Sequence, residues 1–161
     1  MQGKIPLRNA YEFLLAGKCH VMFYTPTPKK GAITTVNKFS YYIKRKKEQF
    51  VWYVYTEQMI YLGYIRGDVF VKTDTTPLII SLAEQKDYFG IFWKHIVAQT
   101  LPDRIHILHV GTCGHCGRKL SDPTSLETGI GPECRKKLSY ASANTRQIDS
   151  EISTGESKRN T

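Results

Sequence analysis

The sequence lacks any long hydrophobic run. Its apolar stretches, such as 78–80 and 91–93, are far shorter than the about 20 residues that a membrane-spanning helix needs. The first ten residues carry charge but have neither the apolar stretch nor the small-residue cleavage site of a secretory signal. We therefore expect a protein without a membrane partner that works in a reducing cytoplasm.

The usual catalytic motifs are also missing. The 161 residues contain no Walker loop, GxGxxG, GxSxG or HExxH, which removes the normal support for nucleotide hydrolysis, dinucleotide redox chemistry, esterase activity and zincin activity. A zinc deaminase needs a Pro-Cys-x-x-Cys run, whereas no second cysteine follows Cys134. A treble-clef nuclease needs more histidines around its metal than His106 and His109 supply. We therefore expect the protein not to be an enzyme.

Acidic residues are scarce. The chain has 14 Asp and Glu against 23 Lys and Arg, a formal net charge of +9, and 41% hydrophobic residues. This hydrophobic content is enough for the core of one ordinary domain with a small satellite. Charges of the two signs balance within 141–161, so the positive excess lies in the preceding residues. Such an excess predicts an anionic partner, and nucleic acid is the first candidate.

Hydrophobic periodicity predicts two helices and a sheet. One helix is expected over 7–17 and a longer one from Ser81, which can form a capping box with Glu84, to a point before Pro102. The apolar stripe of the longer helix is expected to pack on the sheet, and it consists of Tyr88, Phe89, Phe92, Trp93, Ile96 and Val97. Runs rich in Val, Ile, Thr and aromatic residues predict strands over 19–24, 33–43, 49–55, 60–65, 69–73 and 105–110.

These elements predict an α+β fold class. We expect a mostly antiparallel sheet with a packed helix, then a small treble-clef-like zinc module and a disordered C-terminal tail. The corresponding domains are an α+β core over 1–103, a zinc-binding module over 104–140 and a flexible polar tail over 141–161.

Three of the four cysteines have the spacing of a metal site. Cys113 and Cys116 stand two residues apart in a glycine-containing knuckle, and Cys134 follows a Gly-Pro-Glu turn. Cysteines that merely pack, or that form a disulfide, are disfavoured because glycine and charged residues surround these positions. We therefore predict one structural Zn²⁺ per chain. Cys19, at the start of a strand, is expected to be a structural thiol.

A structural zinc ion takes four ligands, so the three cysteines need a fourth. His109 stands four residues before Cys113, at the end of the strand that leads into the knuckle, and fits best. The alternatives are His115, His106, Cys19 and Asp122. The predicted metal ligands are therefore His109, Cys113, Cys116 and Cys134.

The segment 113–134, CGHCGRKLSDPTSLETGIGPEC, resembles the C-terminal signature of a family of small, functionally uncharacterised proteins common in bacteriophages and prophages. The likeness extends upstream to the FLLAGK segment that ends at Lys18, to 61–63, to 92–95 and to the histidine before the knuckle. In the family that histidine usually lies one residue further from the first cysteine than His109 does. The resemblance implies a zinc-binding accessory protein of phage type, acting in the cytoplasm of a bacterial host, with no established reaction.

Basic clusters make nucleic-acid contact the leading functional prediction. The candidate phosphate-binding residues are Lys44, Arg45, Lys46, Lys47, Arg118, Lys119, Arg135, Lys136 and Lys137. Stacking faces are expected from Tyr41, Tyr42, Trp52, Tyr53 and Tyr55 if the sheet has an open side. The alternative function is a protein-binding adaptor or inhibitor, in which a purely structural zinc module presents a surface to a host or phage protein. Salt separates the two, because only phosphate binding weakens steeply with ionic strength.

Overall fold

The computed structural model describes residues 3–26, 37–46, 50–74 and 80–138. Their elements, in chain order, are β1 (Gly3–Ile5), α1 (Leu7–Leu14), β2 (Lys18–Thr25), β3 (Asn37–Arg45), β4 (Trp52–Thr56), β5 (Tyr61–Arg66), β6 (Val69–Lys72), α2 (Ile80–Ala98), β7 (His106–His109) and α3 (Pro123–Thr128). Residues 132–138 are also helical. The predicted tail over 141–161 and Lys47 lie outside the described residues. No helix within these ranges is long and apolar enough to cross a membrane.

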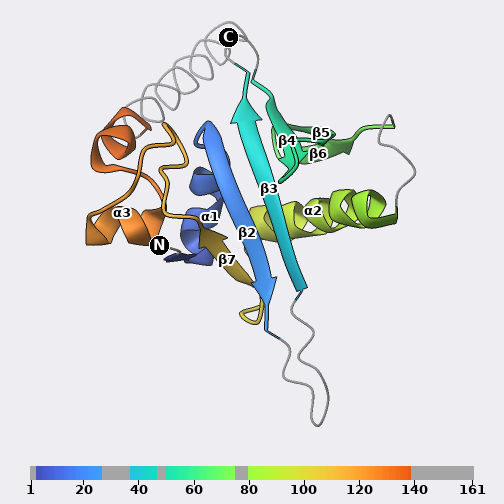
Figure 1. Cartoon of the computed structure of the whole chain (residues 1–161), viewed down its shortest axis with the longest axis horizontal. Helices are drawn as coiled ribbons and strands as arrows, with labels where there is room; N and C mark the ends of the chain where they lie inside the picture. Colours follow the sequence, from blue (N-terminus) through green and yellow to red (C-terminus); the bar gives the residue numbers. More distant parts are fainter. Residues whose placement is uncertain (1–2, 27–36, 47–49, 75–79, 139–161) are drawn as a thin grey trace, which may run out of the picture.

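The strands form one seven-stranded sheet in the order β1-β7-β2-β3-β4-β5-β6. Every neighbouring pair is antiparallel. Strands β2 to β6 follow one another in space as they do in sequence, because short connections favour pairing between consecutive strands (Figure 1). The predicted α+β class with a mostly antiparallel sheet is therefore confirmed.

Strand β7 lies inside the sheet, between β1 and β2. Its Ile107 pairs with Ile5 on one side and with Phe23 on the other. The sequence predicts that this strand belongs to the zinc module of 104–140. In the structure β7 is part of the core sheet, so the segment with the cysteines begins directly from a strand that is paired on both sides.

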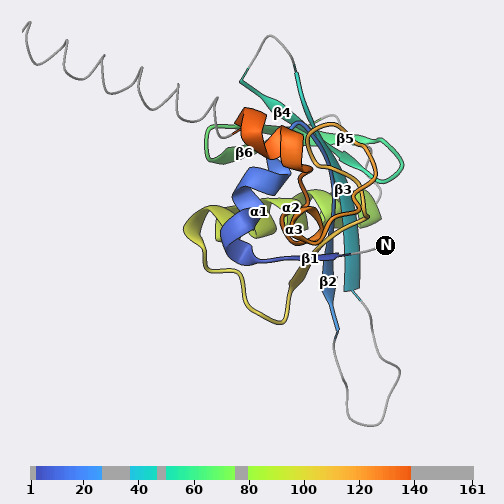
Figure 2. The same cartoon turned by 90° about the vertical axis from the view of Figure 1, so that its left-hand side faces the viewer.

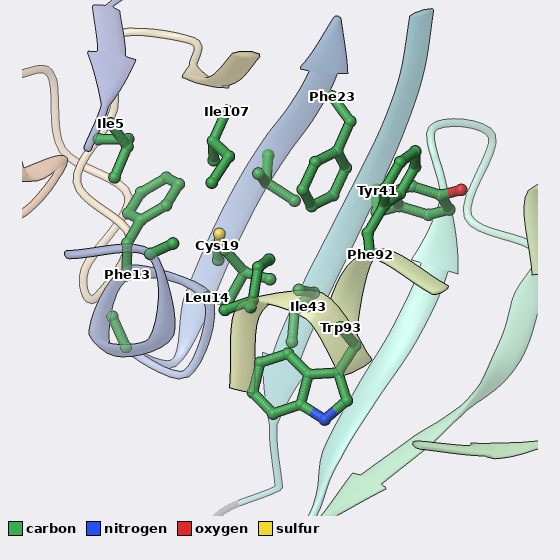
Figure 3. Packing of buried hydrophobic residues seen from close by; sticks show 14 of the residues in the cluster. Ile5, Phe13, Leu14, Cys19, Phe23, Tyr41, Ile43, Phe92, Trp93 and Ile107 are labelled. Carbon is green, nitrogen blue, oxygen red and sulfur yellow. The ribbon is translucent and has the colours of Figure 1, made fainter. Parts of the chain in front are cut away.

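Helices α1 and α2 pack on one face of β2 and β3, which we call the covered face (Figures 1 and 2). Successive side chains of a strand point to opposite faces, so one alternating set must be buried there. That set includes Val21, Phe23, Tyr41 and Ile43, all less than 2% exposed. Figure 3 shows the rings of Phe23 and Phe92 together, and their centroids are 4.3 Å apart.

Helix α2 buries a stripe slightly different from the predicted one. Phe89, Phe92, Trp93 and Ile96 are buried, at the spacing of one helical face, whereas Tyr88 is 42% exposed. The helix begins one residue before Ser81, since α2 already includes Ile80. The predicted packing of the helix on the sheet is confirmed.

Candidate metal centre and basic surfaces

The structure brings Cys113, Cys116 and Cys134 together. Their sulfur atoms all lie within 4.8 Å of one another, and the three residues form a group that could hold a metal ion. Cys113 and Cys134 are buried, and Cys116 is half-buried. Sulfur ligands at about 2.3 Å from a tetrahedral ion would be roughly 3.8 Å apart, so the group needs little movement to close on zinc.

Backbone hydrogen bonds shape the knuckle that carries the first two cysteines. The N–H of Gly117 donates to the carbonyl of Cys113 over 2.9 Å, and the N–H of Cys113 donates to the carbonyl of Arg118 over 2.7 Å. Gly117 has φ of 79°, a left-handed conformation that glycine adopts without strain. The predicted turn after Cys116 is therefore present, and it holds two thiols on the same side of one loop.

The segment between the knuckle and the third cysteine follows the sequence signals closely. Asp122 caps α3 by accepting the N–H of Ser125 over 3.1 Å, Pro123 opens the helix, and Gly129 ends it with φ of 73°. Helical structure then resumes at residue 132, which places Cys134 in a first helical turn. The second half of the cluster is therefore positioned by a helix start, as predicted.

Backbone donors surround the sulfur of Cys113. It accepts the N–H of His115 over 3.4 Å and the N–H of Gly131 over 3.3 Å. Burial alone would raise the pKa of Cys113, but hydrogen bonds from the backbone of Gly131, Cys116 and His115, with one from the Cys116 thiol, together lower it below its usual value. This site therefore favours a thiolate, the form of cysteine that binds metal.

The third cysteine shows the opposite effect. The pKa of Cys134 is raised to about 12, first by burial and then by hydrogen bonds and charge repulsion from the neighbouring thiols Cys116 and Cys113. Three adjacent thiolates repel one another unless a cation lies between them. The cluster thus has the electrostatics of a cation site, because a metal ion removes the repulsion that keeps Cys134 protonated.

His109 does not join the three sulfurs. Its Nδ1 accepts the N–H of Gly111 over 2.9 Å, which leaves the proton on Nε2, and Nε2 donates to the carbonyl of Leu126 over 2.6 Å. The ring is fully buried, and a Cβ on Gly3 would overlap its Nε2. The structure therefore places the predicted fourth ligand in a different role, in which His109 ties the end of β7 to α3 beneath β1.

The alternatives for a fourth ligand also lie elsewhere, and His106 is on β7 with its ring centroid 6.2 Å from that of Tyr24. The Nδ1 of His115 lies 2.6 Å from the carbonyl oxygen of Ala16, and Asp122 caps α3. Cys19 is fully buried within the hydrophobic core, where burial raises the pKa of its thiol well above the ordinary value. Among the described residues, no fourth His, Cys, Asp or Glu belongs to the group of three sulfurs.

The end of α1 is the platform on which the cysteine segment packs, a role that sequence reasoning missed. A Cβ on Gly114 or Gly129 would lie only 2.9 Å or 2.6 Å from the ring of Phe13, so both turns lie directly on that ring. The N–H of Lys18 also donates to the carbonyl of Gly114 over 2.7 Å. The upstream FLLAGK segment therefore contacts the cysteine signature. The occurrence of both segments in one sequence was the signal that could have predicted this contact.

The predicted basic residues come from three separate elements. Lys44 and Arg45 end β3, with Lys46 next to them, and the guanidinium of Arg45 lies 5.4 Å from the ring centroid of Trp52. Arg118, Lys119, Lys136 and Lys137 are exposed on the cysteine segment. Arg135 is partly engaged, since its Nη2 lies 3.8 Å from a carboxylate oxygen of Asp122. Of the predicted set, Lys47 alone lies outside the described residues.

The predicted stacking residues divide between the two faces of the sheet. Tyr41 is fully buried, and the indole N–H of Trp52 donates to the carbonyl of Leu15 over 2.9 Å, so both belong to the covered face. Tyr42, Tyr53 and Tyr55 occupy the alternate positions and are half-buried. The prediction of five stacking faces is therefore wrong for Tyr41 and Trp52, because the packing of α1 and α2 decides which alternating set becomes core.

Comparisons with known proteins bear on the cysteine segment. Residues 106–139 match a family of unknown function (DUF6011). The match begins at β7 and contains all three clustered cysteines, and it agrees with the predicted resemblance to an uncharacterised family. No significant match was found among curated proteins or among solved structures.

Proposed function

We propose that the protein is a non-enzymatic nucleic-acid-binding protein whose C-terminal segment is stabilised by one structural zinc ion. The resemblance of that segment to a family of uncharacterised phage and prophage proteins supports an accessory role of phage type. Two observations support the two parts of this proposal: the cluster of three sulfurs, and the distribution of charge over the strands.

The donor set favours zinc over harder cations. Thiolates are soft ligands that select zinc, copper(I) and iron–sulfur clusters, whereas magnesium and calcium require oxygen. A CxxC knuckle facing a helix start provides the three thiolates from two rigid turns. Zinc bound there would link the knuckle to 132–138, and its binding energy would stabilise this segment on α1.

A cysteine comparison tests the zinc proposal. Cys113→Ala should abolish binding of one zinc per chain, measured by native mass spectrometry and by elemental analysis, and should increase amide exchange in 111–138. Cys19→Ala is the matched control, because it removes the remaining cysteine from the core and leaves the cluster intact. Zinc retained in Cys113→Ala, or absent from the parent protein, would contradict the proposal.

The strands carry charge of one sign only. None of the seven contains Asp or Glu. Their cations are Lys4, Lys18, Lys38, Lys44, Arg45, Arg66 and Lys72. Of these, Lys72 forms an ion pair with Asp87 of α2, and its Nζ lies 2.7 Å from a carboxylate oxygen of Asp87. A sheet with unbalanced positive charge attracts polyanions, and this observation carries the nucleic-acid part of the proposal.

A comparison of two variants that each lose three positive charges tests the nucleic-acid part of the proposal. A triple variant of Lys18, Lys38 and Lys44 to Gln should bind labelled mixed-sequence nucleic acid more weakly, and the slope of log affinity against log salt should fall by up to about 2.7 on duplex DNA or 2.1 on single strands. The matched control replaces Arg8, Lys86 and Lys94, which lie on α1 and α2, by Gln. It removes the same charge from the helical side of the sheet, so a smaller change in slope is expected.

The protein-adaptor alternative is an outcome of the same titration. If the parent protein binds neither DNA nor RNA at low salt, the nucleic-acid proposal fails and the adaptor function replaces it. Equal losses in the two triple variants would show a general charge effect, and would contradict binding at the sheet.

A further inference from the structure

The face of the sheet opposite α1 and α2, which we call the open face, carries rings and cations in two parallel rows. The cross-strand partners His20, Tyr42, Tyr55 and Tyr61 form a continuous row over β2, β3, β4 and β5. We call these four residues the ring row. In Figure 1, β2 and β3 lie in front of α1 and α2, so the view is onto this face.

A second row runs beside the first, two residues away on β2, β3 and β4 and three residues away on β5, where the register shifts between Val54 and Tyr55. In register it consists of Lys18, Lys44, Tyr53 and Tyr64. Two residues along a strand span about 7 Å, so the exposed lysines lie next to the ring row. Their charge is reinforced by Lys46, whose ammonium lies 5.8 Å from the Tyr53 ring centroid. Cations therefore border the rings along one side.

The rings interact with each other but remain accessible. His20 and Tyr42 are stacked, with centroids 4.1 Å apart and planes 26° apart. The ring centroid of Tyr61 lies 5.8 Å from that of Tyr55 and 5.7 Å from that of Tyr53. All of them are half-buried, unlike the fully buried Tyr41 on the covered face. These contacts order the rings into a platform whose outer surfaces still face solvent.

We propose that the open face is a binding site for single-stranded nucleic acid, with bases stacked on the ring row and phosphates beside Lys18 and Lys44. This inference rests on the proposed nucleic-acid function and names its substrate class and site. Every base has a π face, so such stacking tolerates any sequence. Duplex DNA keeps its base faces inside the helix and cannot use a ring platform, and proteins read it through its grooves instead.

The composition of the face favours a nucleic acid over a protein partner. The side chains of its two rows are tyrosine, histidine and lysine, and the strands that carry them contain no carboxylate. Glu57, in the turn after β4, is close enough to affect the charge of His20, and it marks one edge of the face. Of the exposed aliphatic residues, Val69 and Val71 lie on the edge strand β6, where Val71 is the partner of Tyr64, and Ile91 lies on α2. An apolar protein contact would be expected at that edge rather than at the ring row.

Removal of single rings tests the site. Tyr42→Leu and Tyr55→Leu should each weaken binding of a labelled mixed-sequence single-stranded DNA by about 5- to 100-fold, with an unchanged salt slope because no charge is lost. Tyr42→Phe and Tyr55→Phe keep the ring and should bind the single strand as tightly as the parent protein. Tyr88→Leu on α2 is the matched control, since Tyr88 is an exposed tyrosine on the helical side. Circular dichroism and thermal melting report whether each variant is folded.

The outcomes separate this inference from the proposed function. Salt-dependent binding that is unaffected by the leucine variants would overturn the ring site but leave nucleic-acid binding in place. Duplex DNA bound as tightly as the single strand would also overturn it. An absence of binding to DNA and RNA at low salt would overturn both proposals. If a leucine variant fails to fold, Tyr53→Ser takes its place, because it removes a neighbouring ring and should cause the same loss of binding.

Discussion

The two faces of the sheet are built from the same strands, yet they differ in how deeply their side chains are buried. In β3 the covered positions hold Tyr41 and Ile43, both fully buried, and the open positions hold Tyr42 and Lys44, which are half-buried and exposed. The covered face combines aliphatic residues with aromatic rings, whereas the open face combines aromatic rings with cations. Aromatic content alone therefore does not mark a core, because rings of the same sheet are fully buried on one face and half-buried beside cations on the other.

The largest expected effect comes from a ring of the covered side. Phe89 of α2 is fully buried, and its ring centroid lies 4.9 Å from Tyr41 and 4.8 Å from Phe70. Phe89→Ala should lower the free energy of unfolding by about 3–5 kcal/mol, because it removes a large ring and leaves a cavity. Tyr55→Ala on the open face should cost no more than about 1 kcal/mol, the value of a cross-strand pair. Urea denaturation measures both, and equal costs would remove the distinction between the faces.

A smaller effect is expected from a hydroxyl group. Tyr41 donates its O–H to the carbonyl of Gln85 in α2 over 2.6 Å, and burial raises the pKa of this tyrosine, so the donor stays protonated. Tyr41→Phe should cost about 1 kcal/mol, the net value of a buried hydrogen bond. Tyr42→Phe, at the next residue of the same strand, should leave the unfolding free energy almost unchanged. A loss at Tyr42 as large as at Tyr41 would show that the open face is packed as tightly as the covered one.

The smallest expected effect is a pH dependence on the open face. Burial lowers the pKa of His20 below 6.5; Glu57 opposes this shift and Lys38 adds to it. The unfolded chain then binds a proton more readily than the folded one, so the contribution of His20 to stability is complete above pH 6.5 and declines as pH falls through that value toward the folded pKa. His20→Gln should reduce the loss of stability between pH 7.5 and 5.5, measured by urea denaturation. A parent and variant with the same pH dependence would show that His20 is not desolvated.

Local features of the metal centre were predictable because they depend on short stretches of chain. The spacing of Cys113 and Cys116 indicated a knuckle, and Asp122 before Pro123 indicated the start of a short helix. Gly129 indicated the end of that helix. In each case the residue has a backbone or side-chain preference that acts within a few positions. The sequence by itself therefore determined the two turns that hold the sulfurs.

Long-range placements were decided by the tertiary structure. His109 stands four residues before Cys113, a spacing that suits a ligand, but β7 enters the sheet between β1 and β2 and brings its ring under Gly3 to the carbonyl of Leu126. The tertiary structure also decided which face of the sheet is covered by helices. Tyr41 and Tyr42 have identical side chains, so periodicity indicates that they point to opposite sides but not which side α2 covers. That choice depends on how the helices pack across the whole sheet, a free-energy balance between elements distant in sequence that no local preference contains.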